Sequence, residues 1–239
     1  PMPGLGTLVL NDLAVLRGGD TRDGRDALAL ATDGGLYFWT SDGSKARLGG
    51  NVWNNATMVR TGQADADTVE DIVGLMANGN LRCYARGSGQ SGWFVNTGAQ
   101  VLDFALMDWC YNPNGQRDEV VFAHADKIGI VVEGAVASTT TFSALTNGQF
   151  STFSRVQLLA LDCSSGGKRL AILGTNGQHS VLLSLDPGNT VATCRDLNYE
   201  AAGFTCVDEP PGTNDAVLVT PRSDATPTSS CQPSYHAFL

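Results

Sequence analysis

The chain has 239 residues, of which 42% are apolar and 16% charged, and its 15 basic and 24 acidic residues leave a net charge of −9. A negatively charged chain without a cluster of Lys and Arg repels a phosphate backbone, so we expect no nucleic-acid partner and no anionic membrane surface. No apolar run approaches the roughly 20 residues of a membrane-spanning helix, and we expect no membrane insertion.

The sequence begins Pro1-Met2-Pro3-Gly4, with neither a basic leader nor a long apolar segment. We therefore expect a leaderless protein, cytoplasmic or associated with a virion, rather than a secreted one. The six cysteines lack CxxC spacing, which favours free thiols over a disulfide scaffold.

One pattern recurs along the chain at intervals of 45 to 51 residues. An acidic or Gly-rich stretch leads into a short β-type run, and the five runs begin at Asp26, Asp71, Asp118, Arg169 and Asp215. Self-similarity at such a period is typical of repeat folds. An apolar strand precedes each run, at residues 13–16, 58–60, 104–107, 156–159 and 204–207.

Turn signals follow four of the runs. Asp33-Gly34, Asn78-Gly79 and Asn176-Gly177 are typical two-residue hairpin turns, and Ala125-Asp126 holds the same place in the third repeat. A further weak strand then completes each repeat. Four antiparallel strands per repeat are typical of a propeller blade.

The repeats predict a single all-β domain over residues 1–239, a five-bladed β-propeller with four antiparallel strands per blade. The predicted blades cover approximately residues 11–54, 55–100, 101–152, 153–202 and 203–239. The last repeat is too short for a fourth strand, so we expect an N-terminal strand at residues 7–10 to complete it and leave no open edge. The spacing of Val69, Ile72, Val73 and Met76 would also suit a helix, but the repeat register favours a strand.

The loops before the runs resemble the FG-GAP or VCBS repeats of integrin-α-like propellers, whose Asp/Asn-rich loops bind calcium. The resemblance is carried by residues 19–26, 63–71 and 112–118. In the second loop it implies Asp65, Asp67 and Asp71 as metal ligands, and carboxylates are the hard oxygen donors that calcium takes. Thr68 stands where the family has a turn glycine, and loops four and five lack most of the carboxylates. We therefore expect no cofactor or only weakly bound calcium, the alternative being that these side chains cap turns.

Aromatic residues lie at strand ends beside polar residues. This arrangement suits stacking on a sugar ring and predicts carbohydrate binding, although bulky rings can also fill the gaps between blades. The candidate ligand-binding residues are Trp39, Trp53, Trp93, Trp109 and Tyr84.

Three functions remain open from the sequence. The first is a non-catalytic, lectin-like binding propeller, and the second is a protein–protein scaffold or assembly component such as a virion part. The third is a glycosidase, which needs paired carboxylates; the candidates are Asp12, Asp103, Asp108, Asp162 and Asp208. No pair stands out, so we expect no enzyme and no catalytic residue. The expected partner is a glycan or another protein, and an oligomer is possible.

Overall fold

The structure is a computed structural model. It describes residues 8–18, 24–65, 67, 69–86, 92–109, 117–162, 168–177, 179–207, 216–222 and 234–237.

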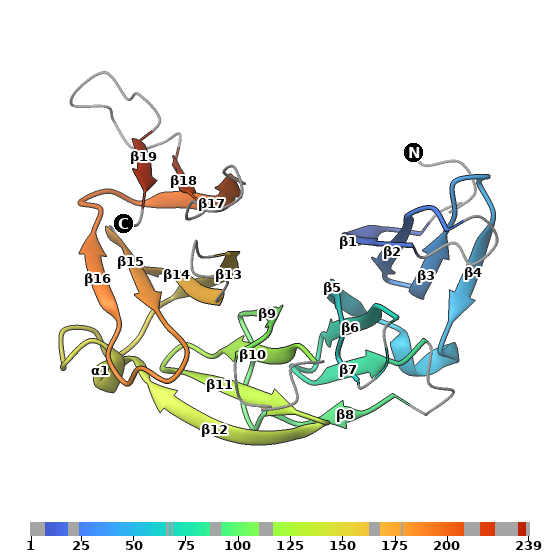
Figure 1. Ribbon diagram of the computed structural model, residues 1–239, viewed down its shortest axis with the longest axis horizontal. Helices are drawn as coiled ribbons and strands as arrows, with labels where there is room; N and C mark the ends of the chain where they lie inside the picture. Colours follow the sequence, from blue (N-terminus) through green and yellow to red (C-terminus); the bar gives the residue numbers. More distant parts are fainter. Residues whose placement is uncertain are drawn as a thin grey trace. The chain divides into compact units, whose positions relative to one another are not determined.

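The strands form five separate antiparallel sheets in chain order (Figure 1). The first sheet contains β1 (Leu10–Leu16), β2 (Ala27–Thr32), β3 (Gly35–Trp39) and β4 (Lys45–Leu48). The second contains β5 (Ala56–Gly62), β6 (Asp71–Met76), β7 (Leu81–Tyr84) and β8 (Phe94–Val95). The third contains β9 (Asp103–Met107), β10 (Glu119–Ala123), β11 (Lys127–Val132) and β12 (Ala135–Thr141). The fourth contains β13 (Arg155–Asp162), β14 (Lys168–Asn176), β15 (His179–Leu185) and β16 (Thr193–Asp196). The fifth contains β17 (Ala201–Val207), β18 (Ala216–Pro221) and β19 (Ser234–Ala237).

In each sheet, consecutive strands are neighbours, as in the blades of a β-propeller. The predicted all-β propeller architecture is confirmed. Helical structure in the described residues is limited to the 3₁₀ turn η1 (Gly50–Trp53) and the short helix α1 (Phe142–Leu145). No helix in the described ranges is long and apolar enough to span a membrane.

The local signals in the sequence correspond to the observed elements. Asn78 and Gly79 lie in the turn between β6 and β7, where Gly79 has a φ of 82° and its N–H donates to the carbonyl of Met76. All six residues of β6 are buried, so the helix-like spacing within that segment arises because both faces of the strand are apolar. β1 begins at Leu10 and β17 at Ala201, slightly before the predicted blade boundaries.

The predicted closing strand at residues 7–10 falls only in part on described residues, and that part lies beside the first sheet. Leu10 pairs with Thr32 in the first sheet, and the backbone N–H of Asp33 donates to the carbonyl of Val9. The pairing of β1 with β2 continues past a register shift between Leu10 and Asp12, so Leu10 belongs to the first sheet. Thr7 lies outside the described residues, and the described part of the fifth sheet has three strands.

The chain divides into two compact units. One unit comprises residues 1–101, 111–120 and 131–137, and the other comprises residues 102–110, 121–130 and 138–239. A cluster in the first unit packs the first sheet against the second, and its largest members are Leu16, Leu36, Trp53, Ile72 and Met76. A cluster in the second unit packs the fourth sheet against the fifth, and its largest members are Leu161, Leu173, Leu182, Leu197, Val217 and Val219.

An aromatic ring packed on a strand glycine recurs in both units. A Cβ atom on Gly74 of β6 would lie 2.4 Å from the Trp53 ring, and one on Gly174 of β14 would lie 2.6 Å from the Phe153 ring. In both cases the ring precedes the first strand of the sheet and the glycine lies in the second strand. A glycine is required there because any side chain would occupy the place of the ring.

Candidate functional site

The structure separates the five aromatic candidates by burial. Trp53 is 3% exposed and Trp109 is 7% exposed, so neither ring offers a face to a ligand. Trp53 packs on Gly74, as described above. For Trp53 this contact agrees with the alternative that bulky rings fill the gaps between blades.

Trp93 and Tyr84 are half-buried and contact other parts of their own unit. A Cβ on Gly134 would lie 2.6 Å from the Cβ of Trp93, and the Trp93 indole Nε1 is buried without an acceptor in the described residues. Tyr84 pairs with Ile72 across β6 and β7 and packs against the core of the first unit. Both residues are held by packing, and neither lines the open pockets described here.

Trp39 is different because it lies at the wall of an open pocket of about 450 Å³. Val15, Leu28 and Trp39 are directly opposite one another on β1, β2 and β3. Directly opposed residues of an antiparallel sheet project from the same face, so the three side chains form one apolar surface. The pocket is lined by Val15, Asp26, Ala27, Leu28, Trp39, Thr40 and Ser41.

The polar groups of this pocket lie at the ends of β2 and β3. One oxygen of Asp26, Oδ1, accepts from the backbone N–H of Gly18 at 2.9 Å. Ser41 is exposed, and its hydroxyl has no hydrogen-bond partner in the described part of the chain. An aromatic ring beside a carboxylate and a hydroxyl can hold a small polar ligand with an apolar face.

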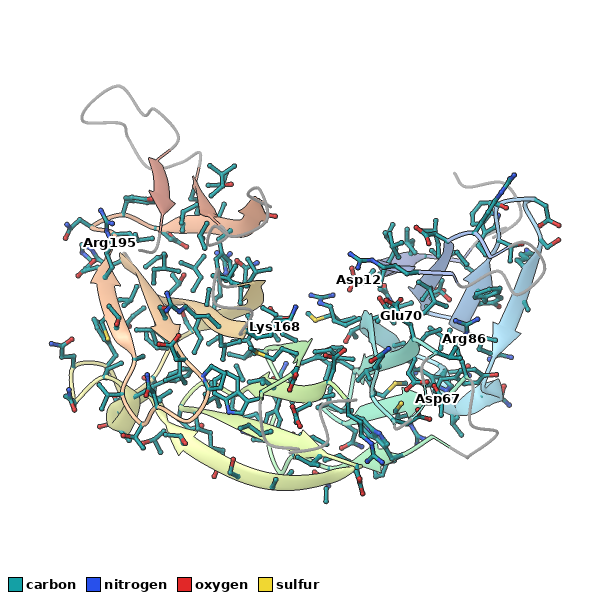
Figure 2. All side chains as sticks on the ribbon, viewed as in Figure 1. Asp12, Asp67, Glu70, Arg86, Lys168 and Arg195 are labelled. Atoms are coloured by element: carbon teal, nitrogen blue, oxygen red, sulfur yellow. The ribbon has the colours of Figure 1, made fainter. Side chains whose placement is uncertain are left out.

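The three candidate metal ligands of the second loop combine turn capping with unpaired oxygens. The backbone N–H of Asp67 donates to Asp65 Oδ1 at 2.9 Å, that of Val69 to Asp67 Oδ1 at 2.7 Å, and that of Arg86 to Asp71 Oδ1 at 2.9 Å. The bonds accepted by Asp65 and Asp67 are the turn-capping contacts that the alternative interpretation expects. The second oxygen, Oδ2, of Asp65, Asp67 and Asp71 is buried and has no hydrogen-bond partner among the residues that the structure describes. Figure 2 shows Asp67 and Arg86 beside the second sheet.

The arrangement of these carboxylates shifts the pKa of Asp71. Its side chain is fully buried, and burial raises its pKa to about 6. Repulsion from Asp65 and Asp67 raises the pKa further, while the hydrogen bond from the backbone of Arg86 opposes the increase. Burial also raises the pKa of the neighbouring Cys83 thiol, with added repulsion from Asp71 and Asp65. The site therefore holds more negative charge than its surroundings compensate.

This donor set fits calcium in its chemistry but is incomplete in its geometry. Three buried carboxylate oxygens without a donor are what a hard cation would satisfy. However, the described residues contain no group of three or more His, Cys, Asp or Glu side chains close enough to hold a metal ion. Ala66 and Thr68 of the same loop lie outside the described residues.

In the first and third loops, the aspartate that begins the following β-type run is hydrogen-bonded to the backbone. Asp26 binds the backbone of Gly18, and Asp118 forms a reciprocal pair with Gln63, whose N–H donates to Asp118 Oδ2 at 2.9 Å. Residues 19–23, 111–116 and 163–167 of these loops lie outside the described residues.

Two of the hydrolase candidates serve as ties between sheets. Asp12 Oδ2 accepts from the backbone N–H of Val59 at 3.0 Å and from Arg60 Nη1 at 2.8 Å. Asp103 Oδ2 accepts from the backbone N–H of Leu158. Asp108 is half-buried with a partner of its own, whereas the side chain of Asp162 and all of Asp208 lie outside the described residues. The sequence alone could not show that these carboxylates bond to the backbone of another sheet, because each hydrogen bond joins residues about 50 positions apart.

No family model matches the chain, and no curated protein matches it. Similar solved structures have β-propeller-like folds. BBS1N in complex with ARL6DN has a TM-score of 0.61 and 13% identity over 89% of this chain and 63% of that chain. Apo AztD from Citrobacter koseri has a TM-score of 0.52 and 12% identity over 80% of this chain and 47% of that chain.

A third similar structure is the exotype rhamnogalacturonan lyase YesX, with a TM-score of 0.50 and 12% identity over 82% of this chain and 46% of that chain. This chain thus spans less than two thirds of the length of these structures. At such identities the similarity establishes the propeller fold. The FG-GAP type of the repeats stays a prediction.

Proposed function

We propose that this chain is a non-catalytic binding propeller whose first blade binds a carbohydrate at Trp39. The observation that carries the proposal is the open pocket in which Trp39 and Leu28 lie beside Asp26 and Ser41. The apolar face of a sugar ring stacks on an indole, and its hydroxyls donate to a carboxylate and exchange hydrogen bonds with a serine hydroxyl. The two carboxylates Asp12 and Asp103 support the non-catalytic part, because each is engaged in backbone hydrogen bonds.

A protein partner is the second candidate, favoured by a specific feature of the same sheet. Leu13 is 43% and Val15 is 49% exposed, and Leu13 pairs with Leu30 just as Val15 pairs with Leu28. Contiguous exposed apolar side chains mark protein interaction surfaces. One similar structure, BBS1N, is itself in complex with ARL6DN. A protein covering this face would bury Leu13 as well as Trp39, whereas a sugar in the pocket would contact Trp39 and leave Leu13 exposed.

We further propose that the second loop binds calcium weakly. Asp65, Asp67 and Asp71 would hold the ion through their unpaired Oδ2 atoms, and its charge would offset their mutual repulsion. The ion would stabilise the loop and take no part in a reaction.

A glycan array with titration calorimetry on the positive sugars tests the carbohydrate proposal. We expect binding to be lost in Trp39→Ala, partly kept in Trp39→Phe, which retains a ring, and weakened in Asp26→Asn. Leu13→Ser is the matched control, since it alters the same face outside the pocket. Sugar binding that is unchanged in Trp39→Ala would contradict the site. An array without any hit, together with a purified protein partner whose binding is lost in Leu13→Ser, would favour the second candidate.

A further inference from the structure

A second pocket, of about 200 Å³, lies elsewhere in the first unit. It is formed where the end of η1 meets the turn between β6 and β7. Asn55 links the two segments, because its N–H donates to the carbonyl of Asp33 and its own carbonyl accepts from the N–H of Ala77. Apart from Ala77, the lining residues are Val52, Asn54, Asn55, Met76, Asn78 and Arg82.

The hydrogen bonds of two asparagines fix which way their amides point. Asn54 Oδ1 accepts from the Arg47 guanidinium, and Asn78 Oδ1 accepts from the backbone N–H of Asn80 at 3.2 Å. An acceptor in these bonds must be the amide oxygen, so the NH₂ group of each residue is left as a donor. These NH₂ groups have no acceptor among the described residues, and the Asn55 amide has no partner there either.

Arg82 adds a positive charge to these donors. Its guanidinium carbon lies 4.7 Å from the centre of the Phe94 ring, and it forms no ion pair or hydrogen bond with the described residues. Stacking on a ring occupies the face of the guanidinium and leaves the N–H groups at its edge free to donate. The pocket therefore presents a cation and amide donors on a chain whose net charge is −9.

We propose that this pocket binds an acidic monosaccharide through its carboxylate. Arg82 would hold the carboxylate by paired N–H donors, the geometry in which guanidinium and carboxylate match. The NH₂ groups of Asn54 and Asn78 would donate to the remaining oxygens, and the Asn55 amide, which can both donate and accept, would bind a ring hydroxyl. Val52, 53% exposed, and Met76 would contact the apolar face of the ring.

This site is separate from the pocket at Trp39 and shares no lining residue with it. The proposal therefore goes beyond the proposed function and can fail independently of it. Trp39→Ala leaves the second pocket intact, and Arg82→Gln leaves the first pocket intact.

Titration calorimetry with D-glucuronate, D-glucose, acetate and inorganic phosphate tests the proposal on the full chain. We expect saturable binding of glucuronate, at least tenfold weaker binding of glucose, and binding of acetate that is weaker than that of glucuronate because the ring contacts are missing. Phosphate that binds as tightly as glucuronate would overturn the assignment to a sugar carboxylate.

Two variants locate the binding. Arg82→Gln removes the charge, and we expect it to weaken glucuronate binding at least tenfold. Asn78→Asp keeps the oxygen that caps the turn and replaces the NH₂ donor by a negative charge, so we expect the same loss without a change in folding. Arg195→Gln on β16, which removes an exposed charge elsewhere (Figure 2), is the control and should bind like the wild type. Glucuronate binding that is absent in the wild type, or unchanged in Asn78→Asp, would overturn the proposal.

Discussion

The carboxylate of Asp103 on β9 binds the backbone of Leu158 on β13, with Oδ2 2.8 Å from the Leu158 nitrogen. Its other oxygen, Oδ1, accepts from the N–H of Phe104 at 2.8 Å. Asp12 on β1 binds Val59 on β5 in the same way. Each aspartate thus connects the first strand of one sheet to the first strand of the next, and hydrogen bonds to a charged carboxylate are stronger than those between neutral groups.

We expect Asp103→Ala to destabilise the fold by about 1–3 kcal/mol, because the buried N–H of Leu158 loses its acceptor. For a chain of this length that corresponds to a melting temperature lower by roughly 2–12 °C, measurable by thermal or urea unfolding. Asp12→Ala is the control with a smaller expected loss, since the Asp12 side chain is 30% exposed and water can replace it. Equal losses of stability in the two variants would contradict the larger contribution expected from the buried hydrogen bond between Asp103 and Leu158.

The same aspartate tests the absence of catalysis. We expect no hydrolysis of glycosides or arabinans by the wild type, because Asp12 and Asp103 are committed to backbone contacts. Turnover that disappears in Asp103→Asn while the melting temperature stays unchanged would show that this carboxylate is a catalytic group.

The aromatic–glycine contacts give a prediction about packing. Gly74→Ala and Gly174→Ala would place a methyl group 2.4 and 2.6 Å from the rings of Trp53 and Phe153. Neither ring can retreat within a packed core, so we expect each substitution to cost about 1–3 kcal/mol in unfolding free energy. Gly203→Ala is the control, because its nearest neighbour is the flexible end of Gln157 at 3.3 Å. A loss as large in Gly203→Ala would contradict the steric explanation.

The sequence predicted what depends on local pattern. Hairpin signals such as Asn78-Gly79 and the apolar runs recur in register, so they define the sheets without any knowledge of long-range contacts. The aromatic–glycine contacts also have a signal in the sequence, because the spacing from Trp53 to Gly74 equals the spacing from Phe153 to Gly174. The sequence could not predict which aromatic ring lines an open pocket, because the surface around Trp39 depends on pairing among β1, β2 and β3. The donor-rich pocket at Arg82 depends likewise on η1 meeting a turn more than 20 residues later.

The raised pKa of Asp71 predicts a pH-dependent stability. A carboxyl whose folded pKa of about 6 exceeds the ordinary 3.8 stabilises the fold fully below about pH 4, and this stability is lost as the pH rises through 6. Asp71→Asn keeps the acceptor for Arg86 and carries no charge. In a calcium-free buffer we expect this variant to be more stable than the wild type by about 2–3 kcal/mol at pH 7 and equal to it near pH 3.5. Urea unfolding at both pH values measures the difference, and a constant difference would contradict the assignment.

Calcium at the second loop gives the last prediction. A ligand that binds only the folded state stabilises it by RT ln(1 + [L]/Kd), about 2.7 kcal/mol at one hundred times Kd. Thr68 replaces the turn glycine, and the described residues contain no group of three or more His, Cys, Asp or Glu side chains close enough to hold a metal ion. We therefore expect millimolar calcium to raise the melting temperature by less than about 3 °C, which at roughly 2–4 °C per kcal/mol corresponds to marginal occupancy.

Two variants with the same local geometry identify the source of any calcium effect. Asp67 and Asp196 each accept a hydrogen bond from the backbone N–H two residues later, at 2.7 and 2.8 Å. Substitution by Asn keeps this bond and removes one charge, so Asp67→Asn should abolish the calcium shift while Asp196→Asn preserves it. Because a protonated carboxyl is a poor ligand, the shift should also be smaller at pH 5 than at pH 7, where Asp71 is ionised. A shift above about 8 °C that disappears in Asp67→Asn would show instead that the loop binds calcium as the loops of FG-GAP repeats do.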